Sequence, residues 1–446
     1  MAGLTTSQLK IIMTLVETAP DAAIRSLDMA LAAEAGADGP MAAIRDLVSA
    51  EAGERRARRI TFAPLSGMCA NSVQDGPRKA LPRQTLTLLW KALKSELPDQ
   101  VSLAVASVMQ SGEDEEASPV FDSLCSAAAG GLRDRGNGAY AAATAMLESH
   151  NPGAAAEVAS FLDLAPLSRN AMSKLSDWVA RMTDERAAAV RLAYRDAAAI
   201  SPDSGPKLLE VLAARLDEPW LILRLVGAIH EHSSDRFLHG SELREICERV
   251  LDDVDRRLDE FSSFDPLGGV EAGYAAANNL IRAVAEISEF ELAIELKKDG
   301  PWGTRVLKQK ALLGKHAETI LKKVEDAVAA ALPLKAPKYG KGLRGSPTFL
   351  QSPDPAAVSK AEAMMAFLDR SRGPSQAGGF ASLRAKVIER LDDRLDDYVD
   401  DVLDNLRSDD PDEPERAAEY MEVVAALIGL YRDEKAAQIV RRRAAA

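Results

Sequence analysis

The residues whose spacing comes closest to a chemical site are seven aspartates between positions 391 and 406. The segment reads LDDRLDDYVDDVLDNL and holds three overlapping copies of the pattern Asp-Asp-x-x-Asp. Carboxylates at this spacing can gather Mg²⁺, because hard cations prefer oxygen ligands. Alternatively, they can form the water-facing side of a helix. The choice separates an enzyme from a scaffold.

Helical geometry favours the water-facing side. At about 100° per residue, apolar and acidic positions of this segment fall on opposite sides of one helix. The apolar side holds Leu391, Leu395, Tyr398, Val399, Val402, Leu403 and Leu406. The acidic side, called the aspartate ladder below, holds Asp392, Asp393, Asp396, Asp397, Asp400, Asp401 and Asp404. The ladder is therefore predicted to point away from the core.

The pattern resembles the magnesium-binding motif of all-helical prenyl-diphosphate enzymes, in which the carboxylates line a cavity. In that family an arginine pair follows the first motif, whereas Asp400 and Asp401 stand here. A second motif is missing, because Asp252-Asp253-Val254-Asp255 has a different spacing. Aromatic residues, at 5%, also offer little to stabilise a carbocation. An Mg-dependent enzyme using Asp392 to Asp404 is kept as an alternative, and no metal or other cofactor is expected.

Repulsion within the ladder calls for a positive surface, because like charges four residues apart destabilise a helix. Lysines are concentrated between positions 297 and 341, and Arg344 follows. We expect this basic stretch to contact the ladder within the chain. A basic partner protein and loosely held divalent cations are the alternatives. The candidate contact residues are Lys335, Lys338, Lys341, Arg344, Asp393, Asp396, Asp397 and Asp400.

The loop at 334–355 combines Pro, Gly and Ser with basic side chains, and it is the best candidate for contact with an anion or a partner. The segment 297–344 can in principle attract a nucleic acid or an anionic membrane, which gives a second alternative function. The charge of the whole chain disfavours binding to a nucleic acid or an anionic membrane, since the formal net charge is −13 and the pI about 5.1. Nucleic acid is therefore not the expected partner, and another protein is.

Three histidines, His230, His232 and His239, lie close together in AIHEHSSDRFLHG. Residues two apart on a helix point in nearly opposite directions, and the His-Glu-x-x-His spacing of zinc proteases is absent. We interpret these residues as helix-terminal histidines that the helix dipole favours. They are a further option for the helical-enzyme alternative.

Cysteine usage points to a reducing compartment. Cys69, Cys125 and Cys247 are far apart and lack CxxC spacing, so neither a disulfide framework nor a zinc site is expected. Cys125 and Cys247 lie in apolar helical patterns and are interpreted as core residues.

Four arginines at 55, 56, 58 and 59 can be read in two ways. Arginine forks hold phosphates well, so the cluster can bind an acidic ligand such as a cyclic dinucleotide. The helix macrodipole also favours basic residues at a helix C-terminus, and the sequence favours this second interpretation.

The composition predicts an all-α protein, because Ala, Leu, Val and Ile carry the apolar content and short breakers separate amphipathic segments. We expect an irregular α-solenoid or stacked helical hairpins with negligible β content. Three parts are predicted: 1–115 with an irregular crossing at 60–82, 116–262 with helical hairpins, and 263–446 with the basic loop at 334–355.

The leading functional prediction is a non-enzymatic cytoplasmic scaffold or adaptor that binds another protein. No signal peptide or membrane span is recognised near the first residues. The bias toward Ala and Arg is typical of a GC-rich bacterial genome. The oligomeric state is left open.

Overall fold

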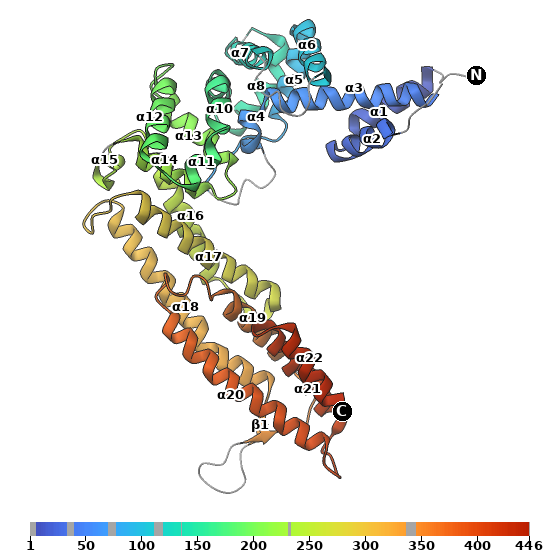
Figure 1. The fold of residues 1–446 in the computed structure, drawn as a ribbon, viewed down its shortest axis with the longest axis vertical. Coiled ribbons are helices and arrows are strands. Elements are labelled where there is room, and N and C mark those ends of the chain that lie inside the picture. The colour runs from blue at the N-terminus through green and yellow to red at the C-terminus, as the bar shows by residue number, and fades with distance from the viewer. Residues whose placement is uncertain are drawn as a thin grey trace. The chain divides into compact units, whose positions relative to one another are not determined.

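The computed structural model describes residues 6–33, 40–69, 77–110, 119–134, 136–230, 233–335 and 345–445. It is all-α, which confirms the predicted fold class (Figure 1). Among the described residues, β structure is limited to a two-stranded antiparallel sheet of β1 (Leu334–Lys335) and β2 (Ser346–Pro347), besides an isolated bridge.

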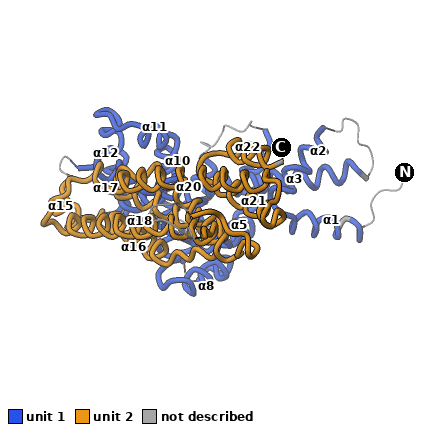
Figure 2. Tube along the Cα trace, turned by 90° about the horizontal axis from the view of Figure 1, so that it is seen from below, with its two compact units in different colours: residues 1–231 blue, residues 232–446 orange. Residues whose placement is uncertain are grey.

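The contacts divide the chain into two compact units, residues 1–231 and 232–446 (Figure 2). The predicted boundary after 262 lies within unit 2, between two helices that pack on each other. The predicted boundary after 115 lies outside the described residues.

Unit 1 is built from fourteen described α-helices and three short 3-10 turns. The helices are α1 (Thr6–Thr18), α2 (Asp21–Ala33), α3 (Pro40–Thr61), α4 (Ala63–Ser66), α5 (Thr85–Glu96), α6 (Pro98–Gln110), α7 (Pro119–Arg133), α8 (Ala141–His150), α9 (Ala154–Asp163), α10 (Ala165–Met172), α11 (Leu175–Ala180), α12 (Asp184–Ala198), α13 (Ser204–Arg215) and α14 (Ile222–Ile229). The 3-10 turns are Gly67–Cys69, Gly138–Tyr140 and Pro219–Leu221.

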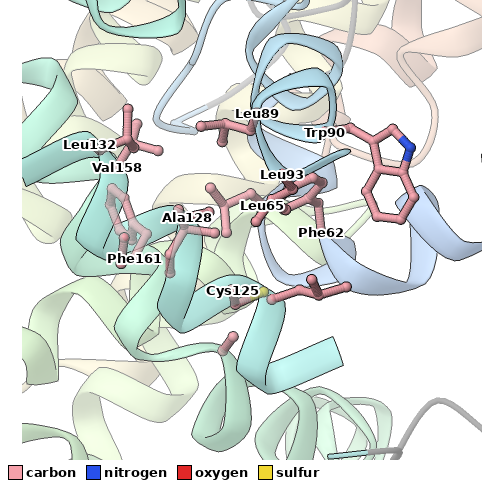
Figure 3. Close-up of a cluster of buried hydrophobic side chains, with 14 of the residues drawn as sticks. Phe62, Leu65, Leu89, Trp90, Leu93, Cys125, Ala128, Leu132, Val158 and Phe161 are labelled. Atoms are coloured by element: carbon pink, nitrogen blue, oxygen red, sulfur yellow. The ribbon is translucent and has the colours of Figure 1, made fainter. Parts of the chain in front are cut away.

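The main core of unit 1 joins the C-terminal end of α3 to α4 through α9 (Figure 3). Phe62 packs edge-on against Trp90, with 6.4 Å between ring centroids. The end of α3 is capped from outside, because Arg169 donates to the carbonyl of Ile60 at 2.6 Å and to that of Thr61 at 2.5 Å. These bonds satisfy carbonyls that a helix end leaves without intrahelical partners.

The crossing predicted at 60–82 is more helical than expected. The chain stays helical through Thr61, and α4 and a 3-10 turn follow up to Cys69. Pro64 lies in the first turn of α4, where proline's missing N–H costs nothing. This proline therefore begins a short helix within the segment that was predicted to be irregular. Residues 70–76 lie outside the described residues, and 77–84 are irregular.

A smaller cluster holds α1 and α2 against α3. It consists of Val16, Ile24, Leu31 and Val48 and is separate from the main core. Arg55 of α3 fastens the join between α1 and α2, donating to the carbonyls of Ala19, Val16 and Glu17 at 2.7 to 3.0 Å. This guanidinium caps the C-terminus of α1 as the macrodipole favours.

Unit 2 contains longer helices (Figure 1). They are α15 (Asp235–His239), α16 (Arg244–Ser262), α17 (Gly269–Ala293), α18 (Gly303–Ala331), α19 (Pro355–Arg370), α20 (Ala381–Leu406), α21 (Pro414–Tyr431) and α22 (Glu434–Ala445), with a 3-10 turn at Pro266–Gly268. Helix α17 packs against α16 and α19, α18 against α19 and α20, and α21 against α19, α20 and α22. The aspartate ladder lies on α20.

Candidate functional site

The aspartate ladder faces outward, as its helical angles predict. The apolar residues from Leu391 to Leu403 named above are at most 2% exposed, and only Leu406 is half-buried. Of the aspartates, Asp392 and Asp401 are half-buried and the other five are exposed. The side of α20 that carries the carboxylates is therefore turned away from the core of unit 2.

Three carboxylates of the ladder pair with arginines of the C-terminal helical pair. Arg432, in the turn between α21 and α22, donates to Asp392 at 2.5 Å and to Asp396 at 2.7 Å. Arg443 of α22 donates to Asp400 at 2.8 Å. These three carboxylates therefore have arginine partners that lie outside the predicted basic stretch.

The other candidate contact residues are less engaged. Asp397 has a contact within the chain, whereas Asp393 is exposed and has no ion pair among the residues that the structure describes. Lys335 is exposed in β1, and Lys338, Lys341 and Arg344 lie outside the described residues. Within the basic stretch, Lys310 pairs with Glu291 at 2.9 Å and Lys322 with Glu318 at 3.2 Å. These two lysines are thus matched locally.

Two of the three histidines, His230 and His239, lie among the described residues, and each stands at the end of a helix. His230 follows the last turn of α14, His232 lies outside the described residues, and His239 ends α15. The Nε2 atom of His239 is 3.7 Å from Glu248 Oε1, and Glu248 also accepts from Trp302 Nε1 at 3.0 Å. Across residues 6–445 with the stated gaps, no group of three or more His, Cys, Asp or Glu is placed to hold a metal ion.

The cysteines are core residues. Cys125 and Cys247 are fully buried, Cys69 is nearly so, and all three thiols are free. Burial raises the pKa of Cys69 and of Cys125 to about 12, so neither supplies a thiolate near neutral pH.

A buried charged group in unit 2 was missed by the sequence reasoning. Arg257 Nε of α16 donates to Asp253 at 2.9 Å and to Glu286 of α17 at 3.0 Å, and all three residues are at most 6% exposed. Burial and the neighbouring Asp253 carboxylate raise the pKa of Glu286 to about 9. Glu286 is therefore protonated at neutral pH, and its carboxyl group can donate to Asp253. In the sequence, Asp253 and Arg257 lie four residues apart and at helical spacing from the apolar Val250. This pattern could have indicated a charged pair on the buried side of the helix.

The structure also places the arginines around position 55 beside a groove in unit 1. It has a volume of about 480 Å³ and lies between α2, α3 and α6. Its apolar lining includes Ile24, Met29, Val108 and Met109. The methionines are open to solvent, with Met29 75% and Met109 53% exposed. The polar lining consists of Asp21, Arg25, Asp28, Ser49, Arg55, Arg56 and Arg59.

The arginines of the groove differ in whether they have a partner within the chain. Arg55 donates to carbonyls at the C-terminal end of α1 and to the carboxylates of Asp21 and Glu51. Arg56 has a contact within the chain. Arg25 and Arg59 are exposed and form no ion pair with any residue that the structure describes. Two unmatched guanidinium groups from different helices thus flank an apolar floor.

Comparisons with protein-family models, with curated proteins and with solved structures find no match to this chain. Among the described helices, none combines the length and the apolar character that crossing a bilayer requires.

Proposed function

We propose that the protein is a non-enzymatic adaptor that docks another protein through the groove between α2, α3 and α6. The observation that supports this proposal is an apolar floor with two largely exposed methionines beside two arginines that form no ion pair among the described residues. Methionine is flexible and polarisable, and arginine is enriched at protein interfaces. A reducing cytoplasm is part of the proposal, since the three thiols are unpaired.

The alternatives gain less support from the contacts. An Mg-dependent enzyme on α20 would have to displace Arg432 and Arg443 from the carboxylates that it needs. A nucleic-acid or membrane contact through 297–344 would draw on lysines of which Lys310 and Lys322 already pair with neighbouring glutamates. The groove in unit 1 has neither conflict.

The test is site-specific photocrosslinking in the cells that make the protein. A benzophenone side chain replaces Met29 or Met109 in the full chain, and matched controls replace Leu192 or Ile200, which are exposed at 55% and 52% in the same unit but outside the groove. We expect one protein adduct of defined mass at both groove positions and none at the control positions.

The same adduct at all four positions would indicate nonspecific contact and would contradict the proposal. Absence of any protein adduct at Met29 and Met109, with the variants folded by circular dichroism, would contradict it as well.

A further inference from the structure

We propose that the occupant of the groove is an acidic amphipathic helix of the partner, an inference that rests on the adaptor function proposed above. Its apolar stripe lies on the methionine floor, and its carboxylates pair with Arg25 and Arg59. The groove is the feature of the described residues where apolar surface, unmatched charge and a suitable length coincide, and each of these bears on the occupant.

The floor of the groove fits an apolar stripe. Ile24 and Val108 are 1% and 4% exposed, so they form a packed base, and Met29 and Met109 add side chains that are open to solvent. The Met109 side chain of α6 lies against Gly53 of α3, where a Cβ would lie 2.6 Å from Met109 Sδ. A surface of this kind accepts the apolar face of a helix, and methionine adjusts to the side chains that it meets.

The charge of the groove selects an acidic occupant. Four arginines and two aspartates line it, so positive side chains outnumber negative ones by two. Arg55 holds Asp21 at 2.8 Å, and Asp28 is half-buried without an ion pair among the described residues. Arg25 on α2 and Arg59 on α3 approach the groove from different helices without ion pairs among the described residues. A guanidinium group pairs with a carboxylate in a bidentate fork, so Glu or Asp on the flanks of a bound helix would satisfy both arginines.

The length of the groove fits a helix of a few turns. Its lining on α3 runs from Ser49 to Arg59, which at the helical rise corresponds to about 15 Å. A docked helix of about ten residues covers this length, and apolar residues at positions i, i+3, i+4 and i+7 would all meet the floor. Without an aromatic residue in the lining, stacking on a nucleobase has no support.

The test uses labelled, helix-favouring synthetic peptides of about 16 residues and the full-length protein. A set of acidic peptides carries Leu, Met or Phe at i, i+3, i+4 and i+7 and Glu on the flanks. One control set replaces each Glu by Lys, and another scrambles the apolar spacing. Fluorescence anisotropy is measured at low and high salt for the wild type, for Arg25→Glu with Arg59→Glu, and for the control Arg181→Glu with Arg195→Glu, whose arginines are exposed in unit 1 outside the groove.

We expect saturable binding of acidic peptides to the wild type and to the control variant, weakened at least tenfold by the Arg25 and Arg59 reversals and by high salt. Met29→Gln, at a side chain that is largely exposed, should weaken binding severalfold without loss of helix content. Failure of every acidic peptide to saturate, equal binding of the Lys peptides, or indifference to the groove reversals would overturn the inference.

The outcome is separable from that of the adaptor proposal. A crosslink at Met29 to a partner whose attached segment is basic or lacks helical apolar spacing would overturn the acidic helix and leave the adaptor function standing. Absence of both crosslink and peptide binding would overturn both.

Discussion

At the residue scale, Glu286 shows how burial changes the chemistry of a side chain. Its carboxyl group is fully buried between α16 and α17, beside the Asp253 carboxylate and the Arg257 guanidinium. Arg256 also pairs with Asp253 at 2.5 Å, so Asp253 is matched twice. At Glu286 the loss of water outweighs the attraction of Arg257, so this carboxyl keeps its proton. The group is a stabilising element whose effect depends on pH.

We expect Glu286→Gln to flatten the pH dependence of stability. The pKa of Glu286 is about 9 in the folded protein and near its usual 4.5 when unfolded, so the folded state binds the proton more tightly. The free energy of unfolding from this group is then largest below pH 4.5, falls by up to about 1.4 kcal/mol per pH unit above it, and levels off near pH 9. Glutamine keeps a donor and does not titrate. Urea unfolding should show the free energy of unfolding of the variant rising relative to that of the wild type by up to about 4 kcal/mol between pH 5 and pH 8.

The control is Glu389→Gln, an exposed position of α20. Its pH profile should run parallel to that of the wild type. A parallel profile for Glu286→Gln would mean that this carboxyl group is ionised when folded and that the assigned proton is absent.

At the element scale, α20 depends on α21 and α22 for its charge balance. Its carboxylates lie four residues apart and repel one another. Arg432 bridges Asp392 and Asp396, and the hydroxyl of Tyr431 donates to Asp392 at 2.5 Å. Arg443 repeats the pairing further along at Asp400. The ladder therefore acts as the docking edge for the C-terminal helical pair.

We expect Arg432→Ala to lower the free energy of unfolding by about 1 to 2 kcal/mol, because two charge-assisted hydrogen-bond partners are left repelling each other. In a background carrying Asp392→Asn and Asp396→Asn, the same substitution should cost clearly less. A double-mutant cycle by urea unfolding measures this coupling free energy. It should be smaller in 1 M NaCl, because the screening length there is about 3 Å. Additive costs in the cycle would show that the pairing contributes nothing to stability.

At the scale of the whole molecule, the chain consists of two compact units, each with its own buried core. The first described residues of unit 2 are tied into that unit, because Glu295 N donates to the Ser233 carbonyl at 3.0 Å and Asp235 N to the Glu295 carbonyl at 3.1 Å. Helix α16 belongs to unit 2 as well, since it supplies Asp253 and Arg257 to the buried group around Glu286.

We expect fragments 1–230 and 233–446 to fold separately, each with helical circular dichroism and a cooperative thermal transition. A fragment 263–446, which starts at the boundary predicted from the sequence, lacks α16 and should melt without cooperativity, because α17 loses the apolar face and the charges that cover it. A cooperative transition for 263–446 equal to that of 233–446 would support the sequence-based boundary instead.

Local periodicity was enough to predict part of this structure. The all-α class and the two sides of α20 follow from the helical period, which a single segment carries in full. Helix ends were harder to predict, because whether Pro64 breaks a helix or begins one depends on the packing of its neighbours.

The sequence by itself determined that this chain forms helices, that the ladder faces outward and that Cys125 and Cys247 are buried. Only the tertiary structure decided which charges meet the ladder, that Glu286 is neutral, and that Arg25, Arg59, Met29 and Met109 share one groove. The physical reason is distance along the chain. Helical faces depend on neighbours within a turn or two, whereas ion pairs, desolvation and grooves depend on segments tens of residues apart that folding brings together.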